Sequence, residues 1–251
     1  MSTASISPAF ILDEQSRLDR IAADSWYSQG LNTCSVEYCA QVFSRFWKGN
    51  RCLEMGPAEG IMTAHLNRAF YDLTLVEGAE SFCDKLRRRY PAATVIRSLF
   101  EDFVPDAPFD TIVLGHVLEH VDNPVQLLRE AGSWLAPGGV ICCAVPNARS
   151  LHRQAAVMLE ILETVDSLNP TDLHHGHRRV YDPDRFRDDF LAAGLRLRHT
   201  GGYWIKPLSN RQMEEAWTPE MIQAFMELGE RYPDIAAEIY IVASAAIEKI
   251  G

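Results

Sequence analysis

The chain has 251 residues, a formal net charge of −10 and a hydrophobic content of 47%, which is ordinary for a globular protein. The acidic balance disfavours a nucleic-acid backbone as the main partner, and no apolar run reaches the length of a membrane span, so neither nucleic acid nor a membrane is an expected partner. The six cysteines show no zinc-like spacing, and with no signal peptide in view they predict reduced thiols in the cytoplasm.

Two segments of helical character precede the first core strand. Leu18, Ile21 and Trp26 have amphipathic spacing, and a second helix is expected from about residue 35 to residue 47. These two segments predict a helical cap at the N-terminal end of the chain.

From residue 51 onward, strands and helices alternate. The expected strands are 51–55, 72–77, 93–97, 109–114 and 139–145, and the expected helices are 60–70, 79–90 and 123–135. Gly138 and Gly139, which follow Pro137, predict a turn that opens the fifth strand. Because strands that alternate with helices form parallel sheets covered on both faces, we predict an α/β fold with a Rossmann-like, mainly parallel sheet.

The last third of the chain departs from this alternation. Residues 148–182 are rich in His and Arg, and a helix is expected from Asp184 to Ala193, before Gly194. Strands are expected at 195–204 and 236–247, with a helical insert between them from about 209 to 231. Two strands joined locally would close the edge of the sheet, which gives seven strands, an antiparallel last strand and a C-terminal lid or insert.

The segment from Leu53 to Gly60 is the most informative part of the sequence. It has the pattern of a buried strand that ends in an acid, followed by a glycine turn and the start of a helix, and a second strand ends in Glu77. Such a turn lets backbone N–H groups and a helix N-terminus approach a ligand closely. The second carboxylate comes where a Rossmann-like unit binds both hydroxyls of a ribose. The pattern predicts a nucleoside-type cofactor.

Further motifs follow in order: Phe109-Asp110, Leu118-Glu119-His120-Val121, Leu135-Ala136-Pro137-Gly138-Gly139 and Pro146-Asn147. With the glycine turn and Glu77, this succession resembles the class I S-adenosylmethionine-dependent methyltransferases, and most closely their small-molecule branch, which includes the ubiquinone-type O-methyltransferases. The resemblance implies transfer of a methyl group to an oxygen or nitrogen of a small polar or anionic metabolite, in natural-product, sugar or quinone-type biosynthesis. It also implies a single methyltransferase domain, 1–251, with a cap over 1–50, a cofactor core over 51–147 and a lid with closing strands over 148–251.

The resemblance also implies which residues bind S-adenosylmethionine: Glu54, Gly56, Gly60, Glu77, Gly78, Phe100, Glu101 and His116. Glu54 would orient the cationic amino group, and Glu77 would accept both ribose hydroxyls. Phe100 and Glu101 would flank the adenine, although this strand end departs from the family pattern. Ala58 stands where the family usually has a third glycine, which is tolerable if its φ is negative.

Histidines supply the candidates for catalysis. His120 follows the fourth expected strand, and an imidazole has a pKa suited to general-base work, so His120 is the first candidate and His177 the second. A structural role at the start of a helix is the alternative for His120.

The run from Asp172 to Tyr181 predicts a substrate lid. His174, His175, Arg178 and Tyr181 would offer hydrogen bonds to the acceptor; a bound metal ion and an exposed polar loop are the alternatives, and no metal is expected. Trp26 and Tyr27 would contact the substrate as a gate, or pack as ordinary aromatic residues.

Two other functions compete with methyl transfer. Gly56 and Gly60 also fit the fingerprint of an NAD-dependent short-chain dehydrogenase, but Met62 replaces its third glycine and no Tyr-x-x-x-Lys pair follows the fourth strand. A non-catalytic cofactor-binding module is the second alternative. The sequence does not indicate an oligomeric state.

Overall fold

A single seven-stranded sheet runs through the computed structural model, which describes residues 8–25 and 28–246. Its strands are β1 (Arg51–Met55), β2 (Asp72–Glu77), β3 (Thr94–Arg97), β4 (Phe109–Gly115), β5 (Leu135–Pro146), β6 (Leu195–Tyr203) and β7 (Glu238–Ala245). They lie in the order β3-β2-β1-β4-β5-β7-β6, and β7 is antiparallel to both of its neighbours while the other pairs are parallel. The predicted Rossmann-like sheet with its antiparallel last strand is confirmed.

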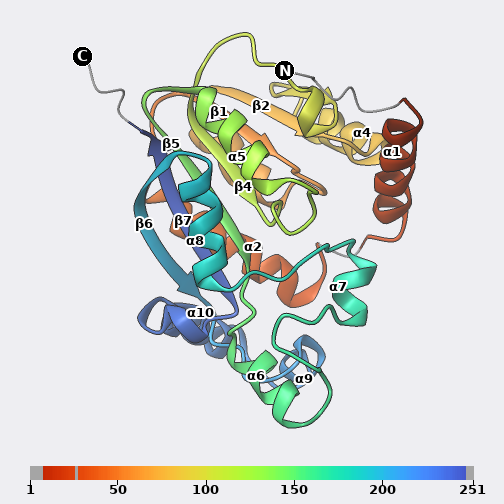
Figure 1. Cartoon of the computed structure of the whole chain (residues 1–251), viewed down its shortest axis with the longest axis vertical. Coiled ribbons are helices and arrows are strands. Elements are labelled where there is room, and N and C mark those ends of the chain that lie inside the picture. Colours follow the sequence, from red (N-terminus) through yellow and green to blue (C-terminus); the bar gives the residue numbers. More distant parts are fainter. Residues whose placement is uncertain (1–7, 26–27, 247–251) are drawn as a thin grey trace.

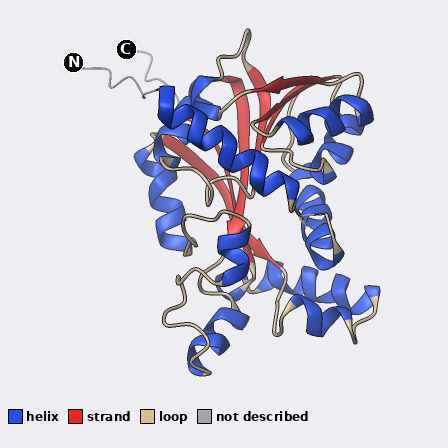
Figure 2. Cartoon of the chain, turned by 90° about the vertical axis from the view of Figure 1, so that its right-hand side faces the viewer, coloured by secondary structure: helices blue, strands red, loops and turns tan. Residues whose placement is uncertain are grey.

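Helices cover both faces of this sheet (Figure 2). They are α1 (Pro8–Ala23), α2 (Gly30–Ser44), α3 (Ile61–Ala69), α4 (Glu80–Arg89), α5 (Pro124–Ser133), α6 (Leu151–Met158), α7 (Pro170–His174), α8 (Pro183–Ala192), α9 (Asn210–Glu214) and α10 (Pro219–Arg231), with short 3-10 turns at Phe100–Asp102 and Pro233–Ile235. In Figure 1, α6 and α9 lie at the lower end of the molecule, and α7 lies above them at the right. None of the described helices is long and apolar enough to cross a membrane.

Alternation along the central strands divides the core into two layers. Cys52, Val113 and Cys142 belong to the apolar cluster on one face of the sheet, whereas their neighbours Leu53 and Ile112 belong to the cluster on the other. A strand that is buried on both faces needs apolar residues at every position, which explains the unbroken apolar runs that predicted these strands. All six cysteines are free thiols.

The fifth strand differs from its prediction. β5 already pairs with β4 at Leu135, opposite Phe109, and Gly138 has a φ of 83° inside the strand. The pairing then shifts, so that Val140 lies opposite Thr111. The expected turn at Gly138 and Gly139 is therefore a bulge within β5 and not its beginning, as is common for glycine in a strand.

Candidate functional site

A cavity of about 1970 Å³ opens at the carboxyl ends of the parallel strands. Its wall combines the turn after β1, the end of β2, the loops after β3 and β4, the lid around α6 and α7, and the start of β7. This is the edge of an open α/β sheet at which ligands bind. The cavity brings together most of the site residues predicted from the sequence.

The glycine turn after β1 has the geometry that its glycines predict. Gly56 has a φ of 66° and Gly60 a φ of 81°, and both conformations favour glycine. A Cβ at Gly56 would lie 3.1 Å from Cγ2 of Val117, so a side chain there would crowd the wall of the cavity. The Gly56 amide donates to the carbonyl of Val76 at 2.9 Å, which fixes the turn to the end of β2.

Ala58 corrects one expectation. Its φ is 47°, in the left-handed region, and not negative as its tolerance was expected to require. A Cβ in this region costs of order 1–2 kcal/mol. The strained conformation aims the Ala58 amide at Oε2 of Glu77, 3.1 Å away. Strain of this kind is often stored at functional sites.

We expect Ala58→Gly to raise the free energy of unfolding by roughly 0.5–1 kcal/mol, because glycine relieves most of the strain but has more freedom in the unfolded chain. Urea denaturation measures the change. Ala64→Gly, in the middle of α3, is the matched control and should destabilise the protein by about 1 kcal/mol. Destabilisation of both variants by the same amount would contradict the left-handed conformation at Ala58.

Glu54 is buried at the end of β1 and lines the cavity, with 2% of its surface exposed. Oγ1 of Thr63, in the first turn of α3, donates to its Oε2 at 2.6 Å. Burial raises the pKa of Glu54 to about 8, and the hydrogen bond from Thr63 opposes this only in part. Without a ligand Glu54 is therefore mostly protonated at neutral pH, and a cationic ligand beside it would favour the ionised carboxylate.

Glu77 is buried at the end of β2, the strand next to β1. Its two oxygens accept from separate backbone amides: Oε1 from Ala79 at 2.8 Å and Oε2 from Ala58 at 3.1 Å. Burial raises its pKa, and these amide donors oppose the shift. The carbonyl of Gly78 accepts a hydrogen bond from Gln15 of α1, so the N-terminal cap lies against the Glu77 end of the cavity.

The loop after β3 lines the same cavity with Phe100 and Glu101. A Cβ at Gly56 would lie 3.4 Å from Cζ of Phe100, which places this ring beside the glycine turn. The positions expected to flank the adenine are therefore in the cavity, on the same side as Glu77.

On the far side of the glycine turn, His116 directly follows β4 and lies between the carboxylates of Glu119, which is buried, and Glu238, which is mostly buried. Its Nδ1 lies 3.6 Å from Oε1 of Glu119 and 3.7 Å from Oε2 of Glu238. Burial opposes protonation of His116, but Glu238 and Glu119 outweigh it and raise its pKa to about 9. His116 also has a φ of 59°, an uncommon conformation for a residue other than glycine. His116 therefore contributes a positive charge to the wall of the cavity at neutral pH.

Two arginines of the lid hold the loop that follows β4. Nε of Arg178 donates to the carbonyl of His120 at 2.7 Å, and Nη1 of Arg179 donates to those of Leu118 and Val121 at 2.9 and 2.6 Å. The amide of Arg178 donates to the carbonyl of Glu119 at 2.8 Å. These bonds join parts of the chain that are far apart in sequence and set the lid against the loop.

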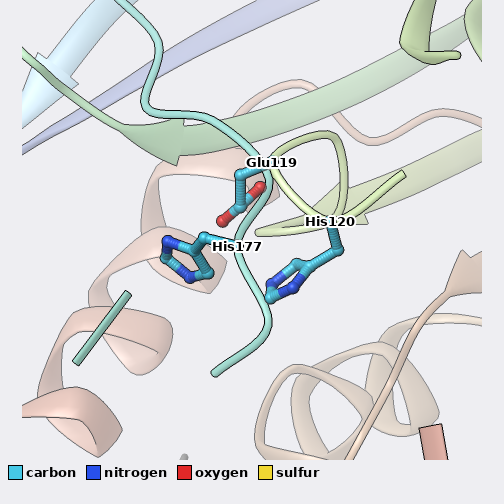
Figure 3. A group of neighbouring side chains, drawn as sticks. All are labelled: Glu119, His120 and His177. Carbon is cyan, nitrogen blue, oxygen red and sulfur yellow. The ribbon is translucent and has the colours of Figure 1, made fainter. Parts of the chain in front are cut away.

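This junction brings both catalytic candidates together. The ring centroids of His120 and His177 are 4.7 Å apart and their planes are nearly perpendicular. Figure 3 shows the Glu119 carboxylate beside the two rings and turned toward them. Burial lowers the pKa of His120 to about 4, so its imidazole is neutral at physiological pH.

A buried ion pair supports His177 from behind. Nη1 of Arg153 lies 3.2 Å from Oδ2 of Asp172, whose Oδ1 lies 3.5 Å from Nδ1 of His177. Burial opposes ionisation of Asp172, but His177, the backbone of Asn169 and Arg153 lower its pKa to about 2. Asp172 is thus a permanent carboxylate that orients the His177 ring.

The structure places three of the predicted substrate contacts elsewhere. Tyr181 is fully buried in the core, where its hydroxyl donates to Asp189 at 2.8 Å. Arg178 binds the loop after β4, as described, and His174 faces α1 with Nε2 3.1 Å from the carbonyl of Asp24. Of the predicted lid residues, His175 and His177 line the cavity.

Trp26 and Tyr27, the expected gate, lie outside the described residues.

Sequence reasoning missed several charged residues of the cavity wall, among them Glu238 and Lys206. Glu238 begins β7, and because that strand is antiparallel, its beginning lies opposite Pro146 at the end of β5. Lys206 follows β6, with Nζ 5.0 Å from the centre of the Trp204 ring, and burial lowers its pKa to about 8. The one sequence signal for Glu238 was its position as an acidic residue at the start of an otherwise apolar strand.

Comparison with known proteins agrees with this geometry. A family model described as a methyltransferase domain matches residues 33–200. The chain is 25% identical over 242 residues to the ubiquinone biosynthesis O-methyltransferase of a Caulobacter species, which covers 85% of this chain and 94% of that relative. It is 26% identical over 216 residues to the protein of the same name from Xanthomonas euvesicatoria, which covers 78% and 87%.

Solved structures with a similar fold include the CcbJ methyltransferase from Streptomyces caelestis, with a TM-score of 0.59, 15% identity and coverage of 84% of this chain and 95% of that one. An S-adenosylmethionine-dependent methyltransferase from Mesorhizobium loti has a TM-score of 0.58, 15% identity and coverage of 81% and 94%. At this level of identity the likeness concerns the fold alone.

Proposed function

The chain belongs to the methyltransferase-domain family and is an S-adenosylmethionine-dependent methyltransferase, and we propose that its acceptor is an oxygen of a small polar or anionic metabolite. Oxygen is preferred to nitrogen because the relatives described above are named O-methyltransferases. The family match favours this function over the dehydrogenase and the non-catalytic module.

The observation that carries the proposal is the placement of Glu54 and Glu77. Both are buried carboxylates at the ends of neighbouring strands, and both line one cavity. Each carboxylate already accepts from the protein, Glu54 from Thr63 and Glu77 from two backbone amides, and its remaining lone pairs can accept from a ligand. Glu54 fits the ammonium of the methionine portion, and Glu77 fits the two ribose hydroxyls.

The chain's own residues prepare the acceptor side. S-adenosylmethionine supplies the methyl group as an electrophile. His116 and Lys206 place positive charge in the cavity, which suits an anionic or hydroxylated acceptor. Holding the acceptor oxygen in line supplies much of the rate, and the lid residues His175 and His177 are placed to do this.

His120 and His177 are the proposed groups that receive the acceptor's proton. His120 is neutral at pH 7, as a general base must be, and His177 lies beside it with its ring oriented by Asp172. A positioned base contributes typically 10²–10⁴-fold to a rate.

His177→Ala should therefore lower kcat by about 100-fold or more while the dissociation constant for S-adenosylhomocysteine changes by less than about threefold. Single-turnover methyl transfer and calorimetry measure the two quantities. His199→Ala, which removes an exposed histidine of β6 next to Phe46, is the control and should change neither. Equal kcat values for His177→Ala and His199→Ala would show that His177 does not act on the acceptor.

Two measurements test the proposed function as a whole. S-adenosylhomocysteine, but not NAD, should raise the melting temperature by mass action. A labelled methyl group should pass from S-adenosylmethionine to an anionic or hydroxylated compound of a cell extract, and the label should be stable as an ether or ester and not as an amine. Stabilisation by NAD alone, or label found on nitrogen only, would refute the proposal.

A further inference from the structure

We propose that Glu119, His120 and His177 form a binding site for a divalent transition-metal ion, with Zn²⁺ as the expected occupant. Each residue offers one ligand atom, and the three atoms lie within 4.8 Å of one another (Figure 3). Bonds to Zn²⁺ are about 2.0–2.2 Å long, so its ligand atoms lie roughly 3–3.5 Å apart. Small rotations of these side chains would bring the atoms to bonding distance.

Glu119 points most directly to a cation. Its exposed fraction is 1%, and neither carboxylate oxygen has a hydrogen-bond partner among the described residues. A buried carboxylate with no hydrogen bond is expensive to maintain. Nδ1 of His116 lies 3.6 Å from Oε1 of Glu119, which is beyond hydrogen-bond distance. The carboxylate therefore has acceptor positions that a bound cation would fill.

The histidines have the supporting contacts that metal ligands need. Metal-bound histidines usually give their second ring nitrogen to a carboxylate or a backbone carbonyl, which fixes the ring. Asp172 lies 3.5 Å from Nδ1 of His177, and His120 has a hydrogen bond with the backbone of Gly176. Nε2 of His177 is then the expected ligand atom.

A different metal site, on the run of histidines in the lid, is disfavoured by the same contacts. His174 lies against Asp24, which follows α1, and Asp172 is paired with Arg153. The rings of His175 and His177 are 6.3 Å apart between centroids. Within residues 8–25 and 28–246, the group around Glu119 is the one in which three ligand atoms meet the distance given above.

The donor set indicates the kind of ion. Two imidazoles and one carboxylate suit Zn²⁺ and other first-row divalent ions, whereas Mg²⁺ and Ca²⁺ prefer oxygen ligands alone. Three protein ligands leave a coordination position open, as in catalytic zinc sites. All three residues line the cavity, so an acceptor oxygen can reach that position.

The metal site deepens the proposed function, on which its catalytic role rests. An acceptor hydroxyl bound to the ion would lose its proton to water, because the ion lowers the hydroxyl pKa. The oxygen lone pair would then form the new bond to the methyl carbon while the carbon–sulfur bond breaks and its electron pair remains on sulfur. In the metal-loaded enzyme the ion would activate the acceptor, and His120 and His177 would hold the ion instead of receiving the acceptor's proton.

The decisive experiment measures metal binding without cofactor or acceptor. Tag-free protein is stripped with a chelator and titrated with Co²⁺, whose visible absorption reports its ligands, and Zn²⁺ is then added in competition. The full-length protein should bind one ion. Glu119→Gln and His177→Ala should each weaken binding by about 100-fold, since even the residues that support metal ligands contribute 10–100-fold. His199→Ala should bind as the unmodified protein does.

The outcomes separate the metal site from the proposed function. Absence of Co²⁺ binding, or equal binding by Glu119→Gln and the unmodified protein, overturns the site. Glu119→Gln keeps the side-chain volume, and a thermal melt verifies that each variant is folded. Zn²⁺ should restore methyl transfer to the stripped enzyme; binding without any change in rate overturns its catalytic role. Failure of all methyl transfer with intact metal binding counts against the proposed function alone.

Discussion

Glu77→Gln is expected to weaken the binding of S-adenosylhomocysteine by about 100-fold. A glutamate can accept from both ribose hydroxyls with charge-assisted bonds, each contributing about 1.5–3 kcal/mol, whereas glutamine offers one neutral acceptor. The difference of roughly 3 kcal/mol corresponds to a factor of about 100 in the dissociation constant. Isothermal calorimetry at constant pH measures it.

The folded state should tolerate this change. Burial raises the pKa of Glu77, so removing its charge relieves a desolvation cost, while the amide oxygen of glutamine can still accept from Ala58 or Ala79. Glu215→Gln is the matched control, because Glu215 is exposed and pairs only with the exposed Arg211 in the part of the chain that the structure describes. If Glu77→Gln binds as tightly as Glu215→Gln, the ribose is held elsewhere and the orientation proposed for the cofactor is wrong.

The strands of the sheet could be predicted from the sequence because the signals for each strand are local. Each central strand is a short apolar run bounded by glycine, proline or an acid, and the strand predicted at 51–55 agrees with β1. Two deviations have local causes that a pattern of residue types does not record. The bulge at Gly138 keeps the segment from Leu135 inside β5, and the positive φ of Ala58 accompanies the hydrogen bond from its amide to Glu77.

The acceptor side was less predictable because its contacts are distant in sequence. Arg178 was expected to donate hydrogen bonds to the substrate, but its guanidinium binds the carbonyl of His120 and the carboxylates of Glu14 and Asp122. Glu238 reaches the cavity only because β7 runs antiparallel to β5. No spacing rule relates these positions, so their roles depend on the folded structure.

Glu54→Gln is expected to have opposite effects on stability and on cofactor binding. The pKa of Glu54 is about 8 in the folded protein and 4.5 as the reference, so folding favours its neutral form. That preference stabilises the fold fully below pH 4.5 and is lost as the pH rises toward 8. Glutamine stays neutral at every pH and can accept the Thr63 hydrogen bond, so the variant should be roughly 3 kcal/mol more stable than the unmodified protein at pH 7. Urea denaturation in the absence of ligand, at several pH values between 5 and 8, measures the difference.

Glu54→Gln should raise the stability of the protein but weaken the binding of the cofactor. The ammonium of the methionine portion requires an ionised Glu54, so the unmodified protein at pH 7 should release about one proton when S-adenosylhomocysteine binds. Calorimetry in buffers of different ionisation enthalpy detects this proton, and Glu54→Gln should abolish it and weaken binding. Glu54 thus lowers the stability of the protein at neutral pH, and the same buried carboxyl group provides the binding site for a cation. A variant that is more stable but releases the same proton would show that another group, and not Glu54, receives the ammonium.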